Sequence, residues 1–154
     1  MQTYLITGGA GFIGSHLADK LLKEGNKVIV VDNFCDFYNP KIKEDNVKHN
    51  LNNANYTLKR IDIRNREELA KAFDEANVDV VIHLAAMAGV RPSIDNPIYY
   101  QEVNCVGTQN ILEEMKAHNV KKLVMASSSS VYGNCKEVPF KEDMVVDFAI
   151  SPYA

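Results

Sequence analysis

The feature that most constrains the fold is a glycine-rich turn, Thr7 to Gly14 (TGGAGFIG), between an apolar run and an amphipathic one. The preceding run, Thr3–Ile6, is short and apolar, as expected for a strand that is buried on both faces. After the turn, apolar residues recur at helical spacing until Gly25-Asn26 provides a stop signal; they are Ile13, Leu17, Leu21 and Leu22. The sequence therefore predicts a strand, a tight turn and a helix.

The spaced glycines have separate physical tasks in that context. Gly8 permits the tight turn, Gly11 the close approach of a diphosphate to the backbone, and Gly14 the close packing of helix on strand. A diphosphate would bind the free N–H groups of Phe12 and Ile13 at the positive end of the helix dipole. The spacing is typical of a dinucleotide-binding turn, although a purely structural glycine turn is the alternative.

A dinucleotide site also needs a ribose-binding acid about 20 positions further on. Asp32 meets this requirement, because it directly follows Lys27–Val31, a second apolar run of strand character. A 2′-phosphate about 4 Å from its carboxylate would cost on the order of 4 kcal/mol at an effective dielectric near 20. The sequence therefore predicts NAD, rather than NADP, as the cofactor.

Composition excludes several classes of protein. The chain has 154 residues, which suits one domain, and its net charge of −3 offers no footprint for nucleic acid or an anionic membrane. It has no apolar run of transmembrane length and no signal peptide ahead of the first strand, so we expect a cytoplasmic protein. The three cysteines are widely spaced and lack a Cys/His pattern, which predicts free thiols and no metal site.

The rest of the chain alternates between strand and helix patterns. Further strands are predicted at Tyr56–Ile61, Val78–Leu84 and Val120–Ala126, with a short surface helix within Lys41–Leu51 and longer helices at Glu67–Ala76 and Ile98–Ala117. Five strands that alternate with helices predict an α/β fold. The predicted architecture is a Rossmann-type doubly wound parallel sheet with helices on both faces and strand order 3-2-1-4-5, or an extension of it.

Polar and small residues at the carboxyl ends of these strands face the predicted ligand site. Asp62 and Ile63 could flank the adenine, although Asp62 could equally cap a helix. The small segment Leu84-Ala85-Ala86 would let the cofactor contact the backbone, and His83 before it is interpreted as a core histidine bonded to backbone, in preference to a catalytic one.

The long helix carries an amide among apolar residues. Its predicted buried positions are Val103, Val106, Gly107, Ile111, Leu112 and Met115. Asn104 lies among them, and a buried amide must be hydrogen-bonded, so it is expected to tie strand ends or a water near the cofactor. A place on the polar face is the alternative. Ser127–Ser130, after the fifth strand, puts hydroxyls at the crevice.

These motifs together resemble the extended short-chain dehydrogenase/reductase family, in particular its NAD-dependent nucleotide-sugar epimerases. The resemblance covers the whole chain: TGGAGFIGSHL from Thr7, DN at Asp32-Asn33, DI at Asp62-Ile63, HLAA from His83, Asn104 with Gly107-Thr108, SSSSVYG from Ser127, and SPYA from Ser151. Residues 36–40 and 88–93 further resemble UDP-glucuronate 4-epimerases more than UDP-glucose 4-epimerases.

The resemblance implies a mechanism and residues for it. In the family a tyrosine takes the proton of the sugar 4-hydroxyl while hydride passes to NAD, and hydride then returns to the other face of the 4-keto sugar. Tyr153 matches this base and Ser128 the hydroxyl that orients the substrate, with Ser129 and Ser130 as neighbours in the substrate site. Arg91 could meet a C5 carboxylate, or be a solvated surface arginine.

The family's lysine, four residues after the tyrosine, falls beyond Ala154. We therefore expect residues 1–154 to be the NAD-binding Rossmann domain of a nucleotide-sugar epimerase without its carboxy-terminal substrate part, and this fragment to be inactive. The resemblance implies a homodimeric parent, paired through the long helix and the tyrosine-bearing helix. The alternatives are a UDP-glucose 4-epimerase, a nucleotide-sugar 4,6-dehydratase, although Ser129 and Ser130 replace the acidic residue of that class, and a non-enzymatic NAD-sensing module.

Overall fold

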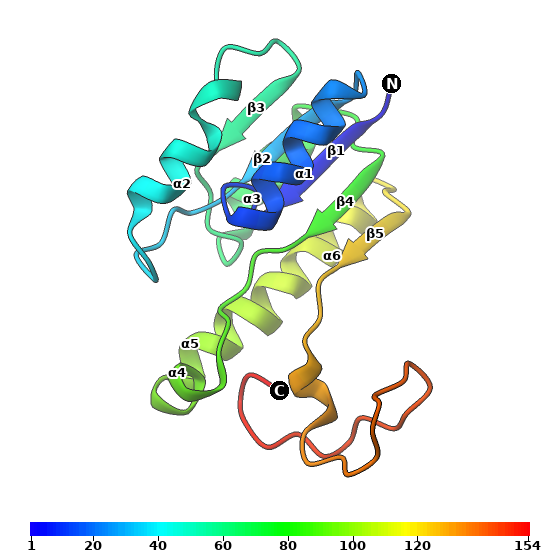
Figure 1. The fold of residues 1–154 in the computed structure, drawn as a ribbon. Coiled ribbons are helices and arrows are strands. Elements are labelled where there is room, and N and C mark those ends of the chain that lie inside the picture. The colour runs from blue at the N-terminus through cyan, green and yellow to red at the C-terminus, as the bar shows by residue number, and fades with distance from the viewer.

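The computed structural model describes residues 1–154 and has a five-stranded parallel sheet at its centre (Figure 1). The strands are β1 (Thr3–Thr7), β2 (Lys27–Val31), β3 (Tyr56–Lys59), β4 (Val80–His83) and β5 (Lys122–Met125). Their spatial order is β3-β2-β1-β4-β5, and every neighbouring pair is parallel. This order confirms the predicted doubly wound fold, in which the chain reverses direction across the sheet between β1 and β4.

Helices cover both faces of the sheet. The helices are α1 (Phe12–Lys23), α2 (Pro40–Val47), α3 (Arg66–Asp74), α4 (Val90–Asp95), α5 (Pro97–Gln101) and α6 (Gly107–Ala117). Because successive strand residues point to opposite faces, the strands contribute side chains to two apolar layers, one on each face of the sheet. Leu5 packs with Phe73 of α3 and Ile111 of α6, whereas Ile6 packs in the layer that contains Ala18 of α1. The sheet is thus buried between two helical layers, and its ligand-facing edge is the one where the strands end.

The predicted long helix is confirmed as one continuous helical segment, since a π-helical turn at Glu102–Val106 joins α5 to α6. Two of its predicted core residues are not buried, because Val106 is 50% exposed and Leu112 41% exposed. The other predicted core residues, Val103, Gly107, Ile111 and Met115, are buried, and an added Cβ at Gly107 would lie 2.6 Å from Ile63 Cδ1. Val106 and Leu112 therefore fall on the flanks of the contact.

The first helix shows a similar shift. Ile13, the first residue of its predicted apolar series, is 67% exposed, and the inward positions are Gly14, Ser15, Ala18 and Leu21. Small residues face the sheet here because α1 lies close to it at the turn. The strands at Tyr56, Val80 and Lys122 are shorter than predicted, and α4 falls in a segment for which no helix was predicted.

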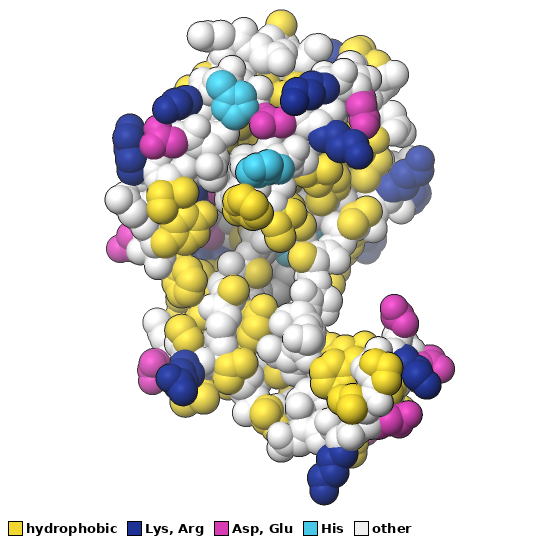
Figure 2. Space-filling view, viewed as in Figure 1, with side chains coloured by type: hydrophobic (Ala, Val, Ile, Leu, Met, Phe, Trp, Pro, Cys, Tyr) yellow, Lys and Arg dark blue, Asp and Glu magenta, His cyan; other side chains and the backbone are white.

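Residues 126–154 leave the sheet after β5 and lie apart from it, beyond the end of the strand (Figure 1). β5 is an edge strand, and its side chains Val124 and Met125 are 59% and 53% exposed. Hydrophobic side chains also gather near the centre of the face shown in Figure 2. At the start of α1, Phe12 and Ile13 are 75% and 67% exposed. None of the helices combines the length and the apolarity needed to cross a bilayer.

Candidate functional site

The glycine turn is fixed by two close approaches of backbone to backbone. Gly8 has a φ of +68°, and its N–H donates to the Val31 carbonyl at 2.8 Å, which ties the turn to the end of β2. A Cβ at Gly8 would lie 2.7 Å from the Ala85 nitrogen, and a Cβ at Gly14 would lie 2.6 Å from the Gly8 carbonyl oxygen. Only glycine fits at both positions, so the turn has the backbone shape that the sequence predicted.

The amino end of α1 lies within this turn and lacks a side-chain cap. Gly11 is the N-cap residue in an extended conformation, and no side chain accepts a hydrogen bond from the first turn. The Ser15 N–H bonds back to the Gly11 carbonyl at 3.0 Å, and the N–H groups before it have no helical acceptor. The N–H groups of Phe12 and Ile13 are therefore available to an anion, as predicted, while both side chains are exposed.

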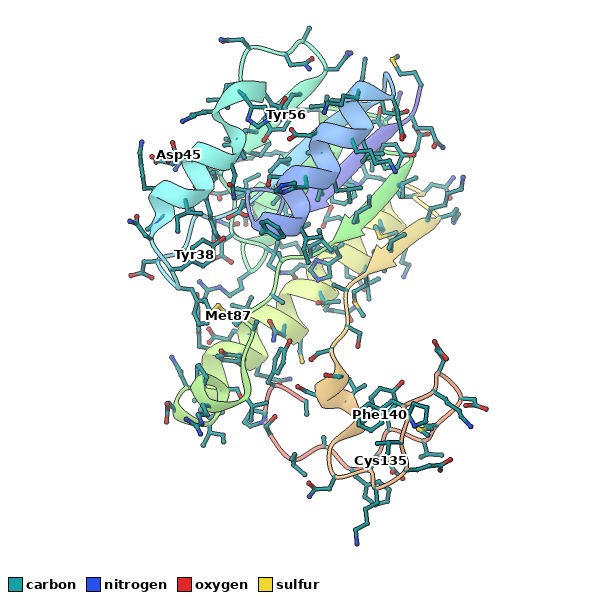
Figure 3. All side chains as sticks on the ribbon, in the orientation of Figure 1. Tyr38, Asp45, Tyr56, Met87, Cys135 and Phe140 are labelled. Atoms are coloured by element: carbon teal, nitrogen blue, oxygen red, sulfur yellow. The ribbon has the colours of Figure 1, made fainter.

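A cavity opens where β1, β2 and β4 end. Its empty volume, counting the open mouth, is about 710 Å³. Most predicted cofactor residues line it, namely Gly8, Gly11, Asp32, Asn33, Asp62, Ile63, Leu84, Ala85 and Ala86, whereas Phe12, Ile13, Gly14 and Asn104 do not. Tyr38, in the loop before α2, and Met87, after β4, also line it (Figure 3).

The acidic residue of the site is buried and paired with a lysine that sequence reasoning missed. Asp32 Oδ1 lies 2.9 Å from Lys43 Nζ, and both side chains are over 90% buried. Asp32 also accepts hydrogen bonds from the N–H groups of Phe34 at 2.9 Å and Ala10 at 3.2 Å. Burial by itself would lower the pKa of Lys43, but the hydrogen bond and charge of Asp32 outweigh it and raise that pKa. Lys43 and Val47, one helical turn apart, are the buried residues of α2, and this spacing was the available signal.

Asp62 lies shortly after the end of β3 and is held by the side chains of Asn33 and Arg64. It accepts from Asn33 Nδ2 at 3.0 Å and from Arg64 Nη2 at 2.8 Å, and Arg64 reaches Glu102 at 3.3 Å. The hydrogen bond from Arg64 lowers the pKa of Asp62 to about 2, against the effect of burial. The helix-cap alternative is wrong, because Asn65 caps α3. Asp62 is thus an ionised group fixed at the edge of the cavity.

The segment after β4 forms the opposite wall of the cavity and is held by Asn104. The Asn104 side chain accepts from the Met87 N–H at 2.8 Å and donates to the Met87 carbonyl at 2.9 Å. Asn104 is half-buried in the π-helical turn. The prediction that this amide is hydrogen-bonded near the ends of the strands is therefore confirmed. The partner of the Asn104 side chain is the backbone of Met87, which lies in this wall of the cavity.

The residues predicted for catalysis and substrate binding lie outside this cavity. Ser128 accepts a hydrogen bond from the Ser130 N–H at 3.2 Å, while Ser129 is exposed and Arg91 is exposed and forms no ion pair. Tyr153 donates its N–H to Ser93 at 3.2 Å, and its ring stands edge-on to the ring of Tyr100, with centroids 6.2 Å apart. No hydrogen bond joins the hydroxyls of Tyr153 and Ser128. The structure therefore brings most of the predicted cofactor residues together in one cavity, and it shows no hydrogen bond between the two residues predicted for catalysis.

His83 is a core residue as predicted, but its partners are hydroxyl groups rather than backbone. It is 4% exposed and lies 2.6 Å from Thr7 Oγ1 through Nδ1 and 2.9 Å from Thr108 Oγ1 through Nε2. Burial lowers the pKa of His83 to about 4. At neutral pH the imidazole is therefore uncharged.

This low pKa predicts a loss of stability in mild acid. Because the unfolded chain binds the proton near pH 6.5 and the folded chain only near pH 4, stability is complete above pH 6.5 and is lost as the pH falls. The loss should reach about 2 kcal/mol at pH 5, measured as the difference in pH slope of urea unfolding between the wild type and His83→Gln. His118, whose pKa is raised by the hydrogen bond from its ring to Asp74, is the control, since His118→Gln should change the slope with the opposite sign.

Comparison with known proteins places the chain in a family. The family described as GDP-mannose 4,6 dehydratase matches residues 5–154. The chain belongs to this family. The match confirms the predicted membership of the extended short-chain dehydrogenases/reductases that act on nucleotide sugars.

Individual relatives and solved structures support the same family membership. A UDP-glucuronate 4-epimerase of Thermodesulfobacterium geofontis is 46% identical over 100% of this chain and 47% of that protein. A bifunctional UDP-glucose 4-epimerase and UDP-xylose 4-epimerase of Pisum sativum is 41% identical over 99% of this chain and 43% of its own length. The Thermus thermophilus UDP-glucose 4-epimerase, solved in complex with NAD, has a TM-score of 0.84 and 36% identity, over 99% of this chain and 46% of that one. The chain spans about half the length of the curated relatives it matches.

Proposed function

We propose that residues 1–154 form the NAD-binding domain of a nucleotide-sugar 4-epimerase that acts on a UDP-sugar. The observation that carries this proposal is the cavity, in which the glycine turn, Asp32 and the Leu84–Ala86 wall meet although they come from three separate strands. The cofactor follows from that arrangement together with relatives that were crystallised with NAD.

The residues present fit a dinucleotide. The uncapped amino end of α1 offers N–H groups to a diphosphate, and the absence of a Cβ at Gly8 and Gly14 keeps the backbone close. Asp32 retains acceptor capacity for a ribose hydroxyl beside the ammonium of Lys43. Asp62 and Ile63 also line the cavity and would flank an adenine.

When bound, NAD supplies a reversible hydride acceptor for C4 of the sugar. Tyr153 would take up the proton of the 4-hydroxyl and Ser128 would orient that hydroxyl, as in the family pattern. In the family pattern a lysine four residues after this tyrosine supplies a cation that favours its ionised form, and residues 1–154 do not include that position. We therefore expect a polypeptide of residues 1–154 alone to show no turnover.

The favoured substrate is UDP-glucuronate. One relative is named UDP-glucuronate 4-epimerase and another probable UDP-glucuronate 4-epimerase. Arg91 is the cation that could meet a C5 carboxylate, with Ser129 and Ser130 as neighbours in the substrate site. The test is to incubate the full-length protein with UDP-glucuronate and with UDP-glucose and to follow the products by chromatography. Formation of UDP-galacturonate supports the proposal. Exclusive conversion of UDP-glucose would overturn the proposed substrate. A 4-keto-6-deoxy product would overturn the proposed reaction type, epimerisation.

The buried Lys43 changes what we expect for NADP. An unpaired Asp32 would oppose a 2′-phosphate by on the order of 4 kcal/mol, but the ammonium 2.9 Å away offsets much of that repulsion. We expect NAD to bind about ten-fold more tightly than NADP, and Lys43→Met to widen that ratio toward a thousand-fold. Calorimetric titration of both cofactors measures it, and a ratio that narrows in Lys43→Met would contradict the role of the pair.

A further inference from the structure

A chain of buried and partly buried hydrogen bonds begins at the end of β1 and reaches the cavity wall. Thr7 Oγ1, which is fully buried, accepts from the N–H groups of Leu84 and Ala85, both at 3.2 Å. The Leu84 N–H is shared with the Thr7 carbonyl at 3.1 Å. A hydroxyl has two acceptor positions and one proton, so with both acceptor positions engaged the proton of Thr7 is directed to its remaining neighbour, His83 Nδ1, at 2.6 Å.

This arrangement fixes the tautomer of His83. Because Nδ1 accepts from Thr7 and the ring is neutral, the imidazole proton must be on Nε2, where it is donated to Thr108 Oγ1 at 2.9 Å. Thr108 then donates to the Asn104 carbonyl at 2.6 Å. In this series of hydrogen bonds each group donates to the next, in one direction from the ends of the strands to the π-helical turn.

The chain holds the cavity wall at both of its ends. At one end Thr7 binds the N–H groups of Leu84 and Ala85, and at the other the Asn104 side chain binds both backbone polar groups of Met87. The wall segment also lies directly against the glycine turn, since a Cβ at Gly8 would be 2.9 Å from the Leu84 carbonyl carbon. The position of this segment therefore sets the width of the diphosphate end of the cavity.

We propose that His83, fixed as its Nε2–H tautomer between Thr7 and Thr108, is a positioning residue that holds the Leu84–Met87 wall in the shape that receives the dinucleotide. The inference rests on the proposed function for the identity of the ligand. The hydrogen-bond chain itself makes claims that do not depend on NAD. His83 acts through Thr7 and Thr108 and does not line the cavity.

The tautomer is tested directly by long-range 1H–15N correlation spectra of the histidine rings at pH 7. A proton on His83 Nε2 is the expected result, and a proton on Nδ1 would overturn the proposal. His83 is identified by the loss of its signals in His83→Gln. If that variant does not fold, the His83 ring is assigned through its own backbone resonances, so the tautomer is read in the wild type either way.

The positioning role is tested with Thr108→Val, which removes the acceptor of His83 Nε2–H at a half-buried site outside the cavity. We expect about ten-fold weaker NAD binding and about ten-fold faster amide exchange at Leu84, Ala85 and Met87, with exchange at Val30 in β2 unchanged. Thr108→Ser keeps the hydroxyl and should restore both values. Unchanged exchange at the wall, or an equal increase at Val30, would overturn the inference. A wild type that binds no NAD but shows the tautomer and the local exchange response would overturn the proposed function instead.

Discussion

Replacing Gly8 by alanine is expected to abolish measurable NAD binding and to lower the free energy of unfolding by about 3 kcal/mol. The new Cβ would lie 2.7 to 2.9 Å from backbone atoms of Leu84 and Ala85, which cannot rotate away as a side chain could. The residue would also hold a φ of +68°, which costs a non-glycine residue on the order of 1 to 2 kcal/mol. Urea unfolding and calorimetric titration with NAD measure the two effects.

Gly25→Ala is the matched control for this change. Gly25 also has a positive φ, +80°, at the end of α1, but a Cβ there has no heavy atom within 4 Å. We expect a loss of about 1 kcal/mol in stability from the backbone conformation and no change in NAD affinity. If the two variants behaved alike, the close approach of the turn to the cavity wall would not be what requires glycine at position 8.

Replacing Asp32 by alanine is expected to have a comparable effect on stability, with a loss of about 3 to 5 kcal/mol. The change leaves the Lys43 ammonium buried without its partner, and it leaves the Ala10 and Phe34 N–H groups without an acceptor. Adding Lys43→Met should recover much of the lost stability, because the unpaired charge is then gone. NAD affinity should stay low in the double variant, since the ribose has lost its acceptor.

An exposed ion pair at α2, the helix that carries Lys43, provides the control for the Asp32 substitution. Asp45, on α2 (Figure 3), lies 3.0 Å from Lys48, which follows the helix, and the two side chains are 48% and 68% exposed. Asp45→Asn should leave both stability and NAD affinity within experimental error, because solvent screens such pairs. A double-variant cycle that showed no coupling between positions 32 and 43 would contradict the structural importance of the buried pair.

The sheet and its turn could be predicted from the sequence because local patterns determine them. Short apolar runs and a glycine spacing specify strands and the turn, and a right-handed connection leaves one economical strand order. The helix faces were less predictable. Gly107 was predicted to be buried, but nothing in the residues around it identifies Ile63 as the residue that it packs against, because that contact depends on tertiary packing.

The site residues could be predicted where they directly follow strands. They could not be predicted where their role depends on an ionic or hydrogen-bond partner from a distant part of the chain. Asp32, Asp62 and Ala85 follow strands, so their meeting in one cavity is a consequence of the topology. Lys43 comes from a polar helix in which the spacing of Lys43 and Val47 is a weak signal of the inward face, and its pairing with Asp32 depends on tertiary packing. The hydroxyl partners of His83 come from β1 and α6, far away in the chain, and a residue-by-residue reading gives no reason to select them.

The bond between Thr7 and the Ala85 N–H joins residues 78 positions apart, and it has a consequence for synthesis on the ribosome. A nascent polypeptide cannot complete the cavity until β4 and the residues after it have left the ribosomal exit tunnel and β4 has docked beside β1. Cofactor capture during translation would therefore start abruptly at that length, and from then on mass action would favour the docked arrangement over reopening.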